Sequence, residues 1–254
     1  TSDESESIES FLRASGSAVD VCLLSRSHCG GHYIEVVRRH CGGARVIFNT
    51  VDLHHLRGER VAFLREDRRA QNNAWKTGER EYAVARQAVA TIVVSEQEAT
   101  LLAEAIPGIL VETFPLVRPS PGRTRPFAQR SGIGFIGGFK HQANVDAIQF
   151  FLEDIWPDIG TRLPDVCFYI IGPDLPERLR DRSDPRVIGV GHVADLGARL
   201  EELRVTVAPL RFGAGAKGKI VSSLAHGVPC VASSIAVEGM ALGGSSPAKA
   251  SSTL

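Results

Sequence analysis

The sequence predicts an α/β protein made of two βα domains, each with a parallel sheet. Short apolar segments rich in β-branched residues alternate with longer segments of helical periodicity, which is typical of βαβ units. The alternation stops at 114–127, where four prolines interrupt it, and then starts again. A chain of 254 residues with 43% hydrophobic residues is long and apolar enough for two modest domains.

The first half contains four segments that are expected to form strands: 18–25, 44–50, 90–94 and 109–114. Between them, helices are expected near 32–41 and over one or two long segments between 57 and 90. Ser95 has the character of a helix N-cap, and Glu98 completes a capping-box pattern three residues later. Strands that alternate with helices in this way indicate a parallel sheet.

The second half repeats the pattern, with strands expected at 132–137, 165–172, 186–190, 204–210 and 228–233. Helices are expected at 144–159, 195–203 and 217–226. The resulting division is a partial N-terminal domain at 1–115, a proline-rich linker at 116–130, a C-terminal domain at 131–240 and a tail at 241–254. The tail is small and polar, so we expect it to be disordered.

Composition narrows the class of protein. Lysine and arginine total 29 residues, as do aspartate and glutamate, so the basic surplus typical of nucleic-acid binders is absent. Five widely spaced cysteines favour free thiols in a reducing compartment. No apolar run reaches about 18 residues, and the acidic, Ser-rich start has neither signal-peptide nor transit-peptide character. We therefore expect a cytoplasmic protein, with attachment to the cytoplasmic face of a membrane left open.

The most informative stretch runs from 209 to 240. A strand there ends in a loop that contains Gly213 and Gly215, and a helix follows near Lys217. Glycine lets backbone N–H groups approach a ligand, and the N-terminus of a helix attracts anions. The loop and the first turn also hold three cations, Arg211, Lys217 and Lys219. The pattern suits a diphosphate and differs from a P-loop, although the glycines could also serve only to make a tight turn.

The segment GKIVSSLAHGVPCVASSIAVEGM at 218–240 resembles the donor site of group 1 glycosyltransferases, also called family 4. The segments at 45–60, 135–157, 168–176 and 187–210 resemble other parts of the same enzymes, so the resemblance covers roughly 18–240. It implies the GT-B fold, in which two Rossmann-like domains face each other across a cleft. Both ends of this chain look abbreviated beside that fold, which leaves the N-domain incomplete. A partner chain or an oligomer could cover the shortened edges.

The resemblance also implies roles for individual residues. Arg211 and Lys219 would hold the donor diphosphate, together with Lys217 and the backbone of Gly213, Gly215 and Gly218. The residues expected near the nucleoside or the sugar are Gly137, Gly138, Lys140, His192, Val193, Ser222 and Glu238. No metal and no cofactor are expected beyond the nucleoside diphosphate sugar, which is a co-substrate.

Candidates for the catalytic acid or base follow the strand at 44–50. Asp52, His54 and His55 could accept a proton from the acceptor, although Asp52 and His55 could instead cap and orient the next helix. His28 and Cys29, with nearby His and Cys residues, also suggest zinc ligands, but their spacing matches no known finger. A metal site is therefore not expected.

The function expected from the resemblance is transfer of a sugar to a hydroxyl of a glycan or lipid-linked acceptor, with retention of configuration, as in polysaccharide biosynthesis. Two glutamates that are frequent in the family are replaced here by Ala214 and Ser222. Their loss keeps an alternative open, a degenerate glycosyltransferase that binds nucleotide or a partner without turnover. A third possibility is another GT-B class, such as a sugar-nucleotide epimerase.

Overall fold

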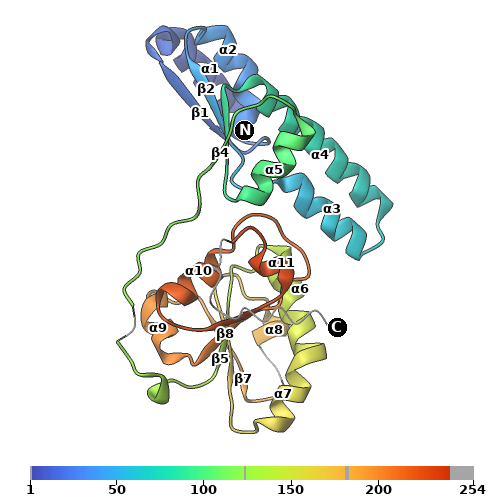
Figure 1. Cartoon of the computed structure of the whole chain (residues 1–254), viewed down its shortest axis with the longest axis vertical. Helices are drawn as coiled ribbons and strands as arrows, with labels where there is room; N and C mark the ends of the chain where they lie inside the picture. Colours follow the sequence, from blue (N-terminus) through green and yellow to red (C-terminus); the bar gives the residue numbers. More distant parts are fainter. Residues whose placement is uncertain (1, 123, 181–182, 241–254) are drawn as a thin grey trace. The chain divides into compact units, whose positions relative to one another are not determined.

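The computed structural model of the chain describes residues 2–122, 124–180 and 183–240. They form two compact units, one drawn from residues up to Pro115 and the other mainly from residues after it. Each unit contains one parallel sheet with helices packed on it (Figure 1). The tail predicted at 241–254 lies outside the described residues.

The N-terminal sheet has four parallel strands in chain order: β1 (Val21–Ser25), β2 (Arg45–Asn49), β3 (Ala90–Val93) and β4 (Val111–Thr113). All four lie within the segments predicted from their β-branched residues. The helices between them are α2 (Ile34–His40), α3 (His54–Leu64), α4 (Arg68–Gln87) and α5 (Glu96–Ala105). Ser95 caps α5 as predicted, because its hydroxyl accepts a hydrogen bond from the N–H of Glu98.

The first helix, α1 (Ser2–Ser15), was not predicted, because its segment is polar and acidic. Its apolar residues Ile8 and Leu12 are four positions apart, so they lie on one side of the helix and pack against the core of the N-terminal unit. This stripe of two residues is too narrow to reveal a helix by periodicity alone.

Only one face of the N-terminal sheet carries the core. Leu24 of β1 and Phe48 of β2 belong to a cluster with side chains from α1, α2, α4 and α5. Side chains alternate along a strand, so Val21 and Leu23 point to the opposite face, where they are 53% and 57% exposed. Four strands laid down in one direction by right-handed crossovers place all their helices on the same side.

The C-terminal sheet has five parallel strands in the order β7-β6-β5-β8-β9. Their bounds are β5 (Ile133–Ile136), β6 (Phe168–Ile171), β7 (Val187–Gly191), β8 (Val205–Ala208) and β9 (Cys230–Ala232). The helix predicted at 144–159 is longer and runs through α6 (Gln142–Phe150), a π-helical stretch at Phe151–Ile155 and α7 (Trp156–Arg162). The other helices are α8 (Glu177–Arg180), α9 (Leu196–Glu202), α10 (Gly218–Ala225) and α11 (Ser234–Val237). The short helices α8 and α11 were not predicted.

The strand order reverses in this sheet, and the reversal places helices on both of its faces. From β5 the chain proceeds outward to β6 and β7, then returns to place β8 on the other side of β5. Ile170 and Ile171 are neighbours in β6, yet Ile170 packs with Phe151 of the helical layer on one face and Ile171 packs with Leu200 of α9 on the other.

Candidate functional site

The central strands β5 and β8 mark the point where the strand order reverses. At such a point the loops that leave the two neighbouring carboxyl ends diverge, and open α/β sheets bind their ligands in the crevice between these loops. The residues predicted to bind the diphosphate lie in the loop between β8 and α10 and in the first turn of α10. Gly137, Gly138 and Lys140 lie in the loop after β5. The topology thus gathers the two groups at one edge of the C-terminal sheet.

The loop between β8 and α10 needs its glycines. Gly213 and Gly215 have φ angles of +156° and +69°, which residues with a side chain rarely adopt. A Cβ atom at Gly213 would also lie 3.1 Å from Cε of Lys217. Lys217 is the N-cap of α10, so the loop ends at the N-terminus of that helix. The same glycines therefore make the turn that leads from β8 into α10.

Lys219 places its ammonium group at the junction of β5 and β8. Its Nζ donates a hydrogen bond to Oδ1 of Asn144 and lies 4.2 Å from the centroid of the Phe135 ring. Burial lowers the pKa of Lys219 to about 7, because the ammonium loses water beside the aromatic ring, and the charge of Lys217 lowers it further. A bound anion would favour the charged form of Lys219.

Asn144 connects the two loops of this edge and was not among the predicted site residues. While its Oδ1 accepts from Lys219, its Nδ2 donates to the carbonyl oxygen of Gly138 at 2.7 Å. A Cβ atom at Gly137 would lie 2.8 Å from the Asn144 side chain, so Gly137 makes room for it. Asn144 thereby fixes the loop after β5 against the first turn of α10.

Arg211 has a partner that was not predicted from the sequence. Its Nε and Nη2 donate to the two carboxylate oxygens of Asp146 in α6, at 2.9 and 2.6 Å. The guanidinium also lies 5.2 Å from the centroid of the Phe150 ring. Two of its five N–H donors are therefore engaged within the protein, and only the other donors of Arg211 could serve the predicted contact with a diphosphate.

The remaining predicted donor-site residues differ in how accessible they are. Lys140 is 81% exposed, with Nζ 3.7 Å from a carboxylate oxygen of Asp174. His192 is exposed in the loop after β7, whereas Val193 packs against a core cluster of the C-terminal unit. Glu238 follows the last residue of α11 and is half-buried.

The two serines of α10 have different environments. Ser223 is buried, and its hydroxyl accepts a hydrogen bond from Thr206 at 2.9 Å and donates one to the carbonyl oxygen of Lys219 at 2.8 Å. Ser222 is half-buried, and its carbonyl oxygen accepts from Nδ1 of His226 at 2.9 Å. Only the hydroxyl of Ser222 is therefore a candidate to replace a ribose-binding glutamate.

In the N-terminal unit, Asp52 and His54 form a pair at the carboxyl end of β2. Nε2 of His54 lies 2.9 Å from Oδ1 of Asp52, and Nη1 of Arg57 donates to Oδ2 at 2.9 Å. Burial alone would raise the pKa of Asp52, but the hydrogen bond from His54 and the charge of Arg57 outweigh it, so the pKa lies below its ordinary value. Asp52 is therefore an ionised carboxylate at neutral pH.

His55 occupies the interior of the N-terminal unit and is 7% exposed. Its Nδ1 lies 2.6 Å from a carboxylate oxygen of Glu81, and its Nε2 lies 3.1 Å from the hydroxyl of Tyr82. Glu81 also accepts from the backbone N–H groups of His54 and His55, so it caps the start of α3. Both ring nitrogens of His55 are thus engaged within the N-terminal unit, and the side chain that caps α3 is Glu81 rather than His55.

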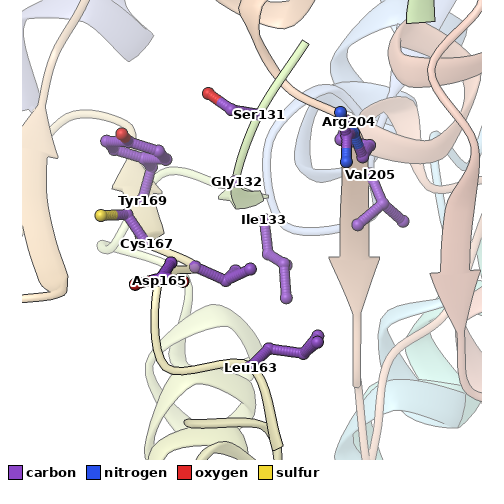
Figure 2. A pocket seen from close by; sticks show the side chains of 10 residues that line it. Ser131, Gly132, Ile133, Leu163, Asp165, Cys167, Tyr169, Arg204 and Val205 are labelled. Carbon is purple, nitrogen blue, oxygen red and sulfur yellow. The ribbon is translucent and has the colours of Figure 1, made fainter. Parts of the chain in front are cut away.

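The cavity in Figure 2 lies at the end of the C-terminal sheet where its central strands begin. It has a volume of about 420 Å³ and is lined at the amino ends of the central strands by residues that include Ile133, Cys167 and Val205. Because the residues predicted for the donor site follow the carboxyl ends of those strands, this cavity is separate from them.

Two further properties concern the described part of the chain. Within it, no three His, Cys, Asp or Glu side chains gather closely enough to hold a metal ion, so the zinc alternative for His28 and Cys29 has no support there. Likewise, no described helix combines the length with the apolar character that a bilayer span requires.

Residues 130–245 match the family model described as Glycosyl transferases group 1. No curated protein matches the sequence. Among solved structures, S. aureus TarM in complex with Fondaparinux, alpha-GlcNAc-glycerol and UDP is 13% identical, with a TM-score of 0.63 over 85% of this chain and 41% of that one. The pneumococcal O-GlcNAc transferase GtfA in complex with UDP and GlcNAc is 16% identical, with a TM-score of 0.59 over 90% and 44%.

Sucrose-phosphate synthase from Thermosynechococcus elongatus is 15% identical, with a TM-score of 0.63 over 85% of this chain and 56% of that one. The chain thus spans about half the length of these three structures. At these identities the likeness establishes the fold class, which is that of the GT-B glycosyltransferases.

Proposed function

We propose, from the premise that residues 130–245 belong to the glycosyl transferases group 1 family, that this protein transfers a sugar from a nucleoside diphosphate sugar to a hydroxyl. The observation that carries the proposal is the position of Lys219, whose ammonium lies at the reversal of strand order beside a glycine-rich loop and the first turn of α10. This combination brings a cation and the positive end of a helix dipole to one place, which suits one anionic ligand.

The chemistry of sugar transfer matches what these groups can do. When the bond from the sugar to the diphosphate breaks, negative charge grows on the leaving phosphate oxygens. Fixed N–H dipoles and an adjacent ammonium stabilise that charge without reorganising, which lowers the barrier. The loop and Lys219 would hold the diphosphate, with Lys217 adding charge, and Arg211 would contribute only the donors that Asp146 leaves. The C-terminal unit would need no metal for this task.

The finer assignments are proposed by analogy with the family and with similar structures. Retention of configuration is a family analogy. The acceptor would be a glycan or a lipid-linked hydroxyl, and the N-terminal unit would supply the acceptor side. TarM and GtfA were both solved with UDP, so UDP is the first nucleotide to test.

Titration calorimetry of the full chain with UDP, GDP and dTDP tests the donor site. We expect one of the three to bind and Lys219→Met to weaken it by about 1.5–3 kcal/mol, or roughly 10- to 150-fold, because a charged hydrogen bond is lost. Lys76→Met, an exposed change in α4 of the other unit, is the matched control and should leave the dissociation constant unchanged. Equal affinities for both variants would contradict the assignment of Lys219.

A second candidate is a catalytically degenerate relative that binds the nucleotide without turnover. The observation in its favour is that Ala214 and Ser222 occupy the positions of two glutamates that are frequent in the family. A single hydroxyl at Ser222 would hold ribose more weakly than a carboxylate. Nucleotide binding without any hydrolysis or transfer from UDP-glucose, UDP-GlcNAc, GDP-mannose or dTDP-glucose would favour this candidate.

A further inference from the structure

One segment of the C-terminal unit packs along the whole length of α10. Residues 116–122, called the strap below, begin beside the first turn of this helix, where Cδ2 of Leu116 lies 3.4 Å from the position that a Cβ atom would take on Gly218. Near the last turn, the carbonyl oxygen of Ala225 accepts from the hydroxyl of Ser120 at 3.3 Å and from a backbone N–H of the strap at 3.2 Å. The strap therefore runs in the same direction as α10 and is held at both of its ends.

The lengths of the two segments agree with this arrangement. Over its eight residues α10 rises about 11 Å. The chain from Leu116 to Ser120 spans about 13 Å when it is extended. The backbone between the two contacts is therefore close to full extension, and Pro119 within it restricts the chain further. A stretched segment of this kind has few alternative paths, so it keeps the residues between its ends close to the helix.

A second group of contacts holds the chain beyond the strap. Arg130 is 2% exposed, and its Nη1 and Nη2 donate to the carbonyl oxygens of Gly227 and His226, just after α10. Beside α9, the N–H of Thr124 donates to a carboxylate oxygen of Glu201 at 3.2 Å. These contacts fix the strap to the two helices that it passes.

Arg118 is the cation that the strap brings to the start of α10. Its Nη2 lies 3.8 Å from the Cβ position on Gly218, which is the first residue of the helix. The side chain of Arg118 is exposed, and among the residues that the structure describes none accepts a hydrogen bond from its guanidinium. The N–H donors of this guanidinium are therefore available to a ligand at the N-terminal end of the helix.

Arg118 adds a third positive charge around the first turn of α10. Lys217 and Lys219 supply the other two, and the helix N-terminus itself carries partial positive charge. These charges oppose one another, since burial and then the charge of Lys217 lower the pKa of Lys219 to about 7. An anion bound among them would relieve this repulsion, so the position favours an anionic ligand.

We propose that Arg118 is a ligand of the donor diphosphate, an inference that rests on the sugar transfer proposed above. The planar guanidinium can donate two parallel hydrogen bonds to the oxygens of one phosphate, which an ammonium cannot do. Lys219 would hold the diphosphate from the side of β5, and Arg118 from the side of the strap. Because a diphosphate carries more negative charge than a monophosphate, Arg118 should make the site select nucleoside diphosphates over monophosphates.

Titration calorimetry of the full chain with inorganic pyrophosphate, UDP, GDP and dTDP tests the inference. We expect Arg118→Met to weaken the binding of pyrophosphate, and of the nucleotide that binds, by about 5- to 20-fold, an effect that screening of an exposed cation keeps moderate. Arg118→Lys should restore part of the loss, because it keeps the charge but not the paired donors. Arg125→Met is the matched control, since it removes another exposed arginine beyond the strap, and it should leave the affinities unchanged.

Three further measurements separate a ligand contact from a structural effect of Arg118. The affinity of wild type for the nucleoside diphosphate should exceed that for its monophosphate, and this ratio should shrink in Arg118→Met. The affinity for pyrophosphate should fall less steeply with added NaCl in the variant, because one fixed cation fewer takes part. The midpoint of urea unfolding should stay the same, since the substituted side chain is exposed.

The outcomes distinguish this inference from the proposed function. Equal binding of pyrophosphate to wild type and Arg118→Met, no binding to either, or equal weakening by Arg125→Met would overturn the role of Arg118. A nucleotide that binds wild type and Arg118→Met equally well would do the same and leave the proposed function standing. If pyrophosphate binding depends on Arg118 but none of the three nucleotides binds, the proposed function fails, and with it the donor as the ligand of this residue.

Discussion

Asp146 of α6 and Arg211 of the loop after β8 form two parallel hydrogen bonds of 2.9 and 2.6 Å, which tie that loop to the helix following β5. We expect Asp146→Asn to lower the free energy of unfolding by about 1–2 kcal/mol, because an amide accepts only one of the two charged bonds. The side chain of Arg211 is 40% exposed, which keeps the effect moderate. Chemical denaturation measures it.

The control for this variant is Asp158→Asn, an exposed change on α7. Asp158→Asn should lower the free energy of unfolding by less than about 1 kcal/mol, since it removes only an acidic charge from the first turn of a helix. Equal effects of the two changes would mean that the bidentate pair adds nothing to stability.

Lys219 should make stability depend on pH in the alkaline range. Its pKa is lowered from 10.5 to about 7 in the folded chain, so between these values the unfolded chain binds more protons than the folded one. Stability contributed by this group therefore rises as the pH increases from about 7 to 10.5. The test is to measure the free energy of unfolding of wild type and of Lys219→Met across that range. As the pH rises, wild type should gain stability relative to Lys219→Met.

Nucleotide binding should raise the pKa of Lys219, whereas folding lowers it. A diphosphate beside Lys219 favours the ammonium, so binding at pH 8 is expected to take up a proton. Calorimetry in two buffers of different ionisation enthalpy measures that uptake, and Lys219→Met should abolish it. Uptake that persists in this variant would assign the proton to another group.

Glu81 has three hydrogen-bond donors around a carboxylate that is 2% exposed. Glu81→Ala should lower the free energy of unfolding by about 3 kcal/mol or more, because two backbone N–H groups and the ring of His55 lose their acceptor. Glu79→Ala, two residues away on the exposed side of α4, should change it by less than about 0.5 kcal/mol. Thermal and urea denaturation of both variants provide the comparison.

Leu23 and Leu24 are adjacent in β1 but should respond very differently to truncation. Leu24→Ala removes a buried side chain from the core and is expected to cost about 2–5 kcal/mol. Leu23 is 57% exposed on the uncovered face, so Leu23→Ala should cost less than about 1 kcal/mol. Similar losses for both would show that something covers that face in solution.

Most of the fold could be predicted from local signals. All nine strands lie within or at the edges of segments chosen for their β-branched residues, because a strand buried in a parallel sheet has to be apolar along its length. The helix α1 was missed because only Ile8 and Leu12 carry its packing. The observed helix ends differ from the predicted ones by a few residues, because capping residues such as Asp195 determine where a helix begins.

The site was harder to predict, because its partners are distant in the sequence. Asn144 and Asp146 lie 75 and 65 residues from the cations that they contact, so no local pattern links them. His54 and His55 are neighbours of the same type, yet one reaches the edge of the sheet and the other the interior. The loop proposed for the diphosphate could be singled out from the sequence because its glycines and cations lie close together in the chain.

The reversal of strand order at β5 and β8 has a consequence for how each half can tolerate change. A domain that winds in one direction can gain or lose a terminal βα unit and merely become wider or narrower. A domain whose strand order reverses at its middle has no such freedom at the centre, since its two central strands contact both layers of helices and also lie beside the site proposed for the ligand. Substitutions that harm folding and substitutions that harm donor binding should therefore coincide along β5 and β8.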